Sequence, residues 1–421
     1  MTTDPAKDAV AVIETAVARR FGELVDRFAP SLRAMVTADT LQAGWDQATG
    51  RLGALTDIGE PVVAAAQGAT VVKVPVTFTD GAVAVVVSMA GSGDLVGIQL
   101  APLAAMSPQE WEPPAYADTA RFAEHDVTLG DDALAVPGTM TVPDGDGPGV
   151  VILAGSGSND RDGTIGPSKP LKDLAWGLAS RGIAVVRFDK VTHAHPAEVV
   201  KDPNFTALDE YRAAALAAIA RLPGPTVLLG HSLGGSIAPR IAAEVGDLAG
   251  VVLFAAGAEP LHWSAVRQVR HLAELGPAGV EGAAPIIDAM TEQARRVDDP
   301  GLTAQTPANL LPFGLPAPYW LDLRDYDQVR AAANLAIPMF VVNGGRDYQV
   351  TLADDLARWR AGLAHRADVT FREYPADNHF FFPGDQPSSP EEYQRLHHVD
   401  ETVVADLASW VSALGGRAAG G

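Results

Sequence analysis

The sequence predicts an α/β protein with a mostly parallel, doubly wound sheet and a helical cap insertion, preceded by a small α+β domain. Three observations lead to this prediction. In the last two thirds of the chain, short continuous apolar runs alternate with helical patterns, which is typical of strands buried on both faces. In the first hundred residues, helical patterns are followed by β-branched runs between turns. Between 257 and 336 the alternation stops for longer than any ordinary connection.

The first domain is predicted to span residues 1–105. Apolar residues recur at helical spacing from Asp8 to Phe28, and a second helix runs from Asp39 to about Leu52. Four β-branched runs between turn residues then predict an antiparallel meander: 61–66, 70–78, 82–89 and 95–100. The domain contains no His, no Cys and no clustered carboxylates, so we expect it to pack, to bind a ligand or to form a homodimer instead of carrying the chemistry.

A proline-rich linker is predicted at 106–121, and the catalytic domain at 122–421. A hairpin is expected first. The apolar runs that follow it are predicted to be parallel strands: 149–155, 183–189, 226–230, 251–255 and 338–343. Ligands of such sheets bind beyond the carboxyl ends of the strands. We therefore look for the chemistry in the loops that follow these runs.

The run at 226–230 leads into Gly230-His231-Ser232-Leu233-Gly234, a buried strand that turns sharply into a helix. Glycine is required two residues to either side of Ser232, because side chains there would collide with the strained turn. This is the pattern of a nucleophile elbow. It places the Ser232 hydroxyl at a helix N-terminus, where the N–H of Leu233 is free to stabilise an oxyanion.

A serine hydroxyl needs an imidazole to take its proton and a carboxylate to orient that imidazole. Behind a nucleophile elbow, the acid precedes the histidine in the chain. Asp347 follows the strand at 338–343, and His379 follows another predicted strand at 369–374, so we predict them as acid and base. Asp377 is the alternative acid.

Other histidines fit the role of base less well. His193 and His195 precede the serine, and His231 lies inside the elbow as a neighbour. A metal site at His397, His398 and Asp400 is disfavoured, because adjacent side chains on a helix point apart. We predict no metal site and no cofactor.

The glycine-rich loop at 154–163 lacks the spacing of a phosphate-binding loop, and its aspartates would repel an anion. It fits an oxyanion hole, with the N–H of Ser156 as the second donor beside that of Leu233. The aromatic side chains of the predicted cap, 257–336, are expected either to line a substrate pocket or to pack the cap on the sheet. The predicted substrate-binding residues are Gly157, His231, Phe313, Tyr319 and Trp320.

From about Asp126 to Val411 the chain resembles an α/β-hydrolase of the bacterial esterase, dienelactone-hydrolase-like group. The resemblance rests on several motifs together: Asp160-Arg161-Asp162-Gly163, Phe188-Asp189-Lys190, Gly230 to Gly235, Tyr319 to Leu323, Gly345 to Val350 and Asn378-His379. It implies the same triad of Ser232, Asp347 and His379. True dienelactone hydrolases use a cysteine as nucleophile, so Ser232 favours ordinary ester cleavage. By its order of elements and by positions such as Trp45 and Gly53, the first domain resembles a nuclear-transport-factor-2-like domain of unknown function.

Composition narrows the choice of partner. A formal net charge of −21 disfavours nucleic acid and anionic membrane surfaces, which the chain would repel. No signal peptide or long apolar run is present, so we expect a cytoplasmic protein. The sequence thus predicts a serine hydrolase acting on a small-molecule ester. Thioesterase, lactonase, amidase or acyltransferase activity, and a non-catalytic ligand-binding role, remain alternatives.

Overall fold

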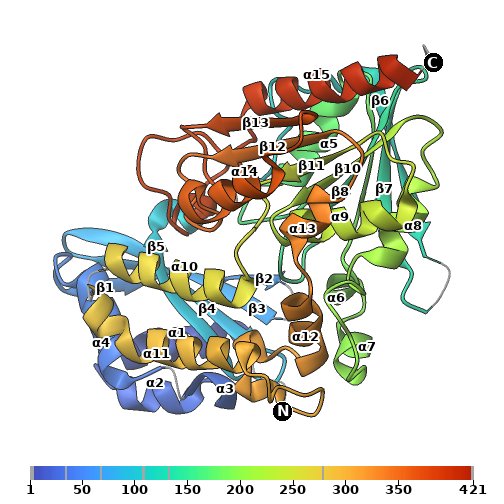
Figure 1. The fold of residues 1–421 in the computed structure, drawn as a ribbon. Helices are drawn as coiled ribbons and strands as arrows, with labels where there is room; N and C mark the ends of the chain where they lie inside the picture. Colours follow the sequence, from blue (N-terminus) through green and yellow to red (C-terminus); the bar gives the residue numbers. More distant parts are fainter. Residues whose placement is uncertain are drawn as a thin grey trace. The chain divides into compact units, whose positions relative to one another are not determined.

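The computed structural model describes residues 4–33, 36–66, 69–106, 110–130, 133–276 and 279–418. The chain divides into two compact units, Met1–Gln109 and Glu110–Gly421. Figure 1 shows both units as ribbons coloured along the sequence. Each unit has its own apolar core.

The first unit consists of helices followed by an antiparallel sheet (Figure 1). Its helices are α1 (Pro5–Val17), α2 (Phe21–Arg27), α3 (Pro30–Arg33) and α4 (Ala38–Thr49), and its strands are β1 (Leu55–Ile58), β2 (Val62–Ala66), β3 (Ala69–Phe78), β4 (Gly81–Ala90) and β5 (Leu95–Pro102), with a short η1 (Leu103–Met106) at the end. The strand order is β1-β3-β4-β5, with β2 also paired to β3. Buried side chains of α1 and α2 share a core with alternate residues of β3 and β4.

The apolar pattern from Asp8 to Phe28 does not form one continuous helix. Arg19, between α1 and α2, has φ 60°, a left-handed conformation that an α-helix cannot contain. The turn allows apolar side chains of both helices, such as Ile13 and Phe21, to enter the same core. Strand β1 was not among the predicted strands.

The second unit is built around a mixed sheet, which has the order β13-β12-β11-β10-β8-β9-β7-β6 among the described residues. Its strands are β6 (Phe122–Leu129), β7 (Val136–Pro143), β8 (Gly149–Leu153), β9 (Ala184–Phe188), β10 (Thr226–His231), β11 (Gly250–Phe254), β12 (Met339–Gly344) and β13 (Val369–Tyr374). The six strands from β13 to β9 in this order, β8 included, pair in parallel. Strands β6 and β7 form an antiparallel hairpin, and β7 pairs antiparallel with β9. The tip of this hairpin, at 131–132, lies outside the described residues.

Helices cover both faces of this sheet (Figure 1). One face packs against α8 (Arg212–Ile219), α9 (Leu233–Val245), α13 (Gln328–Ala333) and α14 (Ala357–Leu363), and the other against α5 (Pro170–Ala179) and α15 (Glu401–Ala418). Every residue of β8, β10 and β11 is buried, which is why these strands read as unbroken apolar runs. This is the predicted doubly wound architecture, an α/β-hydrolase fold.

A helical insertion separates β11 from β12. It contains α10 (Leu261–Leu275), α11 (Gly279–Asp298), η3 (Ala308–Leu310), η4 (Pro312–Gly314) and α12 (Ala317–Asp325), followed by α13. Residues Val297, Leu302, Leu311, Ala317 and Trp320 form a small core within it. Two short helices, α6 (Val191–Ala194) and α7 (Pro196–Lys201), follow β9.

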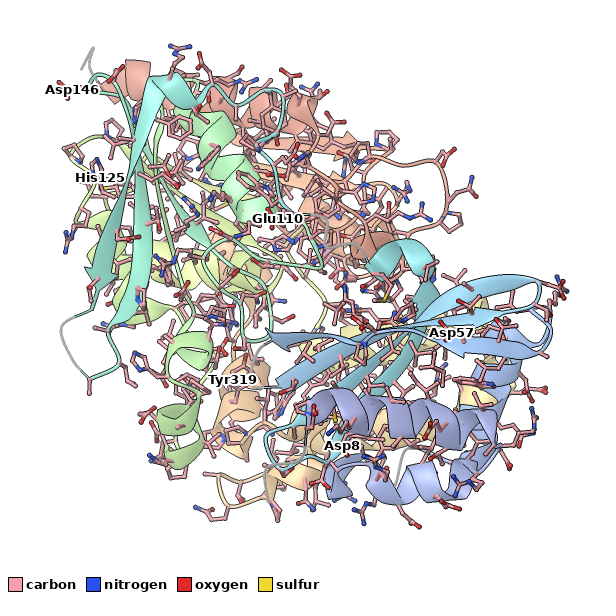
Figure 2. The ribbon with its side chains drawn as sticks, turned by 180° about the vertical axis from the view of Figure 1, so that it is seen from behind. Asp8, Asp57, Glu110, His125, Asp146 and Tyr319 are labelled. Carbon is pink, nitrogen blue, oxygen red and sulfur yellow. The ribbon has the colours of Figure 1, made fainter. Side chains whose placement is uncertain are left out.

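The segment at 110–121, predicted as part of a linker, belongs to the second unit. The indole of Trp111 lies against that of Trp176, with ring centroids 4.9 Å apart, and its Nε1 donates a hydrogen bond of 2.8 Å to Asp173. Glu110 and His125, both labelled in Figure 2, mark the start of this unit and its edge strand β6. No helix within the described residues is both long and apolar enough to cross a membrane.

Candidate active site

Ser232 sits at the turn between β10 and α9 with φ 53° and ψ −121°, a strained conformation for a residue with a side chain. The turn is possible because its flanking residues lack Cβ atoms. A Cβ on Gly230 would approach the carbonyl oxygen of Gly234, and one on Gly234 would approach that of Ala154 at 2.5 Å. Ser232 is the N-cap residue of α9. Leu233 is the first residue of this helix, so its backbone N–H has no partner within the helix.

Asp347 and His379 come together beyond β12 and β13. Nδ1 of His379 donates a hydrogen bond of 2.7 Å to Oδ2 of Asp347, and both side chains are buried. The other carboxylate oxygen of Asp347 accepts from the backbone N–H groups of Gln349 (2.7 Å) and Val350 (2.9 Å). These hydrogen bonds hold the carboxylate in place. Because the carboxylate accepts from Nδ1 of His379, the proton of the neutral ring is on Nδ1, and Nε2 is free to accept another.

His379 and Ser232 line the same cavity of about 220 Å³. His231 lies beside them, with its ring centroid 4.7 Å from that of His379. Burial, and secondarily the neighbouring His379, hold the pKa of His231 well below its ordinary value, so its ring is neutral. Because its Nε2 faces the carbonyl oxygen of His379 at 3.1 Å, Nε2 is the protonated nitrogen and supports the loop that carries His379.

The loop after β8 approaches Ser232 closely, since a Cβ on Gly155 would lie 3.2 Å from that of Ser232. The side-chain amide of Asn159 donates to the carbonyl oxygens of Gly155, Ser156 and Gly157 at 2.7 to 3.2 Å. These carbonyl groups are thereby turned toward Asn159. Ser156 lines the cavities next to Ser232, as the predicted second oxyanion donor requires.

A buried ionic network that the sequence analysis did not predict holds the same loop. The ammonium of Lys190 donates to the carbonyl oxygen of Gly155 (2.9 Å) and pairs with Glu210 (2.7 Å), and all of these atoms are removed from solvent. The hydroxyl of Tyr211 also donates to Gly155 (3.1 Å). Burial lowers the pKa of Lys190 and the Glu210 carboxylate opposes that change.

The network reaches the insertion through Tyr319, which is labelled in Figure 2 and belongs to α12. Its hydroxyl donates to Glu210 at 3.3 Å, and burial raises its pKa well above the ordinary value, so the group stays a neutral donor. A wall of the cavity beside Ser232 is thus tied to the loop that carries Ser156. Two motifs of the sequence, Phe188-Asp189-Lys190 and Tyr319 to Leu323, contain members of this network, but the sequence did not reveal that they meet through Glu210.

Ser232 also lines a second and larger cavity, of about 400 Å³. Of the predicted substrate-binding residues, Gly157, Phe313 and Tyr319 line it, whereas His231 lines the smaller cavity. The sequence analysis missed other parts of its wall: Leu261, Ala265, Gln268, Leu315, Leu323 and Tyr326.

Trp320 is not brought to either cavity. Its side chain is fully buried in the core of the insertion, against Val297, Leu311 and Ala317. Successive residues of a helix point about 100° apart, so when Tyr319 faces the cavity, Trp320 faces away. The prediction that Trp320 binds substrate is therefore wrong, because its side chain packs within the insertion.

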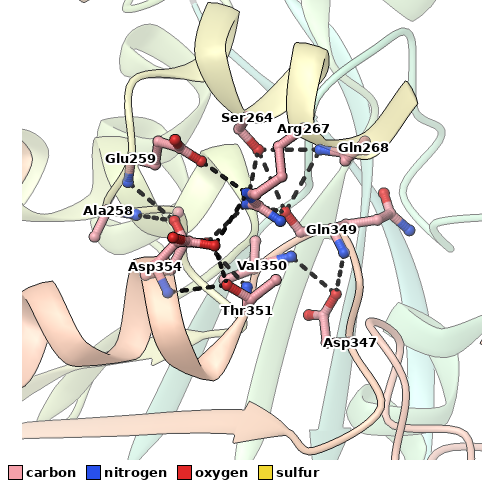
Figure 3. Close-up of polar contacts among 12 residues, drawn as sticks. Ala258, Glu259, Ser264, Arg267, Gln268, Asp347, Gln349, Val350, Thr351 and Asp354 are labelled. Atoms are coloured by element: carbon pink, nitrogen blue, oxygen red, sulfur yellow. Dashed lines mark hydrogen bonds and ion pairs between the residues drawn. The ribbon is translucent and has the colours of Figure 1, made fainter. Parts of the chain in front are cut away.

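Arg267, on α10, forms hydrogen bonds with the loop that carries Asp347 (Figure 3). Its guanidinium donates to the carbonyl oxygens of Tyr348 (3.0 Å) and Gln349 (3.1 Å), to Glu259 (2.9 Å) and to Asp355 (3.1 Å). Asp355 is fully buried and also accepts from three backbone N–H groups, those of Ala258, Glu259 and Thr351. Burial raises the pKa of Asp355, and these donors and Arg267 oppose the change.

Asp377, the alternative acid, is not hydrogen-bonded to His379. It is buried, and neither carboxylate oxygen has a hydrogen-bond partner among the described residues. Burial, followed by the charge of Asp400, raises its pKa to about 7, with Arg346 opposing. Within the described part of the chain, no group of three or more His, Cys, Asp or Glu side chains is arranged to hold a metal ion.

Comparison with known proteins agrees with this architecture. Residues 150–396, more than half of the chain, match the profile of the family described as "Alpha/beta hydrolase family". The chain belongs to the alpha/beta hydrolase family. Esterase EstD of Thermotoga maritima is 31% identical to it over 96% of this chain and 95% of that protein. Residues 9–98 match a family described as a protein of unknown function, DUF3887.

Two solved structures match at lower sequence identity. Est1E from Butyrivibrio proteoclasticus matches with a TM-score of 0.43 and 13% identity, over 69% of this chain and 98% of that one. The 2,6-dihydroxy-pseudo-oxynicotine hydrolase matches with a TM-score of 0.43 and 14% identity, over 69% and 68% of the two chains. The family assignment therefore rests on the profile match and on the relative with 31% identity.

Proposed function

We propose that this alpha/beta hydrolase cleaves carboxylic esters of small to medium, largely apolar substrates through Ser232, His379 and Asp347. The observation that carries the proposal is the 2.7 Å hydrogen bond between His379 and Asp347 at a cavity that Ser232 also lines. The relative named esterase EstD supports the choice of an ester as substrate.

In the proposed reaction, Nε2 of His379 takes the proton of the Ser232 hydroxyl as its oxygen attacks the ester carbonyl carbon. The N–H groups of Leu233 and Ser156 stabilise the resulting oxyanion, and losing one such donor typically slows a reaction by about 100 to 1000-fold. The alcohol departs with the proton from His379. Water, activated by the same imidazole, then releases the acid and restores Ser232.

Asp347 stabilises the imidazolium that forms during each half of the reaction, without itself becoming protonated. Its position is fixed by the N–H groups of Gln349 and Val350. We further propose that the insertion serves as the cap of the substrate site, because its side chains line most of the larger cavity. Apolar lining and exclusion of water strengthen the electrostatic contribution of the oxyanion donors.

Hydrolysis of phenyl acetate by the purified full chain tests the proposal. We expect measurable turnover that falls by at least about 1000-fold in Ser232→Ala and His379→Ala, since either change removes a member of the triad. Ser409→Ala is the matched control, because Ser409 is an exposed residue of α15 whose hydroxyl bonds to the backbone carbonyl oxygen of Ala405 and lines neither cavity beside Ser232. Turnover that persists in Ser232→Ala would exclude the proposed nucleophile.

A further inference from the structure

Ser232 lines two cavities that differ in size and in most of their lining residues. Ser156, Ser232 and Gln349 line both. The larger, of about 400 Å³, is walled by residues of the insertion, and the smaller, of about 220 Å³, by the loop after β8 and the loop that carries His379.

The position of His379 distinguishes the two cavities. Its side chain lines the smaller cavity and is not part of the wall of the larger one. In ester cleavage the imidazolium must deliver its proton to the oxygen of the departing alcohol, so this oxygen must lie within hydrogen-bond reach of Nε2. The two substituents of the carbonyl carbon point in different directions from the tetrahedral centre, which leaves the other cavity for the acyl group.

We propose that the alcohol portion of the substrate occupies the smaller cavity and the acyl portion the larger one, so that the preferred substrates are esters of a medium-length apolar acid with a small alcohol. This inference rests on the proposed ester hydrolysis and assigns the orientation of its substrate.

The volumes of the two cavities limit the sizes of the acyl and alcohol groups. At about 30 Å³ for each water-sized group, the larger cavity accommodates roughly 13 non-hydrogen atoms and the smaller roughly 7. The larger thus holds an acyl chain of up to about ten carbons, and the smaller an alcohol up to the size of phenol.

The chemistry of the two linings agrees with this orientation. The larger cavity has an apolar wall, formed mainly by Leu261, Ala265, Phe313, Leu315, Tyr319 and Leu323. Its one carboxylate, Glu259, is already paired with Arg267 at 2.9 Å, which leaves no charged group to favour a charged acyl chain. The smaller cavity is lined by the polar side chains of Asn159 and His231, which the larger cavity lacks, as well as by Ile165 and Leu171.

In this orientation the acylation step forms one bond, breaks one bond and transfers one proton. The bond between the Ser232 oxygen and the carbonyl carbon forms, and the bond between that carbon and the alcohol oxygen breaks. The Ser232 proton passes to Nε2 of His379 and from there to the departing oxygen in the smaller cavity. The alcohol leaves from the His379 side while the acyl group stays bonded to Ser232 in the larger cavity.

Two isomeric esters provide the test, because methyl decanoate and nonyl acetate contain the same atoms but exchange the sizes of their acid and alcohol. The decanoyl group fits the larger cavity, whereas nonanol exceeds the smaller one. We expect kcat/KM for methyl decanoate to exceed that for nonyl acetate by at least 10-fold, measured by alcohol release from the full chain. An equal or reversed preference overturns the inference.

Two substitutions narrow one cavity at a time, and each is normalised to methyl acetate hydrolysis by the same variant. Ala265→Leu fills part of the larger cavity, so the methyl decanoate to methyl acetate ratio of kcat/KM should fall at least 5-fold. Ile165→Phe fills part of the smaller cavity, so the phenyl acetate to methyl acetate ratio should fall by a similar factor. The opposite pattern in these two variants places the acyl group in the smaller cavity and overturns the inference.

The outcome also separates this inference from the proposed function. Ester turnover that disappears in Ser232→Ala but favours nonyl acetate refutes the orientation and leaves the hydrolase intact. No Ser232-dependent turnover of any of these esters refutes both.

Discussion

Nδ1 of His379 donates a 2.7 Å hydrogen bond to Oδ2 of Asp347, and the second oxygen of this carboxylate is held by two backbone N–H groups. Asp347→Asn should lower kcat by about 10⁴-fold, because an amide donor at this position favours the tautomer whose Nε2 already carries a proton. Steady-state kinetics with phenyl acetate measures this loss.

Asp377→Asn is the matched control for this change, since Asp377 lies two residues from His379 but makes no hydrogen bond to its ring. We expect kcat to stay within about 3-fold of the parent. A larger loss in Asp377→Asn than in Asp347→Asn would reverse the assignment of the acid.

Asp377 should instead contribute to the dependence of stability on pH. Burial raises its pKa to about 7, so between about pH 4 and pH 7 the folded chain binds a proton that the unfolded chain releases. The contribution of Asp377 to the free energy of unfolding is therefore greatest at the acidic end, falls by at most about 1.4 kcal/mol per pH unit across this window, and is constant above it.

The measurement is urea unfolding of the parent and of Asp377→Asn from pH 5 to pH 8. The variant should gain stability relative to the parent as pH rises through this range, because an amide has no proton to lose. A constant difference between the two proteins at every pH would show that Asp377 titrates normally.

The buried pair of Lys190 and Glu210 should be far more sensitive to single than to double substitution. Lys190→Met leaves a buried carboxylate unpaired and should cost about 3 to 5 kcal/mol of unfolding free energy. Adding Glu210→Gln should recover part of that loss, because the unpaired charge is removed. Glu373→Gln, which breaks the exposed pair with Arg360, is the control and should cost no more than about 1 kcal/mol.

The same double variant tests whether this network positions the oxyanion loop. Lys190 donates to the carbonyl oxygen of Gly155, next to Ser156, so kcat should fall by about 10 to 100-fold while KM changes little. Binding of a trifluoromethyl ketone, which mimics the tetrahedral intermediate, should weaken by a comparable factor. A variant that recovers stability and retains the parent's kcat would leave the network with a structural role only.

Arg267 should support both stability and activity, since it joins α10 to the loop of Asp347 (Figure 3). Arg267→Met removes hydrogen bonds to charged and carbonyl groups and should cost about 1.5 to 3 kcal/mol, with a fall in kcat. Arg267→Lys should recover only part of both, because an ammonium cannot reproduce the planar set of donors. Arg296→Met, at an exposed ion pair, should change stability by less than about 0.5 kcal/mol.

The strands of the second unit and the elbow could be predicted because burial leaves a local record in the sequence. Strands β8, β10 and β11 are buried along their whole length and therefore appear as continuous apolar runs. The glycines beside Ser232 are required by close backbone contacts that any such turn makes.

Other features depend on contacts between distant segments and leave no such record. Lys190 meets Glu210 and the Gly155 carbonyl only in the folded chain, and no spacing rule links them. Apolar periodicity could not decide whether Tyr319 or Trp320 faces the cavity, and the structure places Trp320 in the core. The left-handed turn at Arg19, which ends α1, also lacks a sequence signal, because glycine or asparagine is the residue usually found there.

Covalent labelling with a fluorophosphonate tests whether Ser232 is a nucleophile activated by His379. Mass spectrometry of the labelled, digested chain should find one adduct, on the peptide that contains Ser232. The adduct should be absent in Ser232→Ala and should form at least about 100-fold more slowly in His379→Ala. Labelling that continues at the parent's rate in Ser232→Ala would exclude Ser232 as the nucleophile.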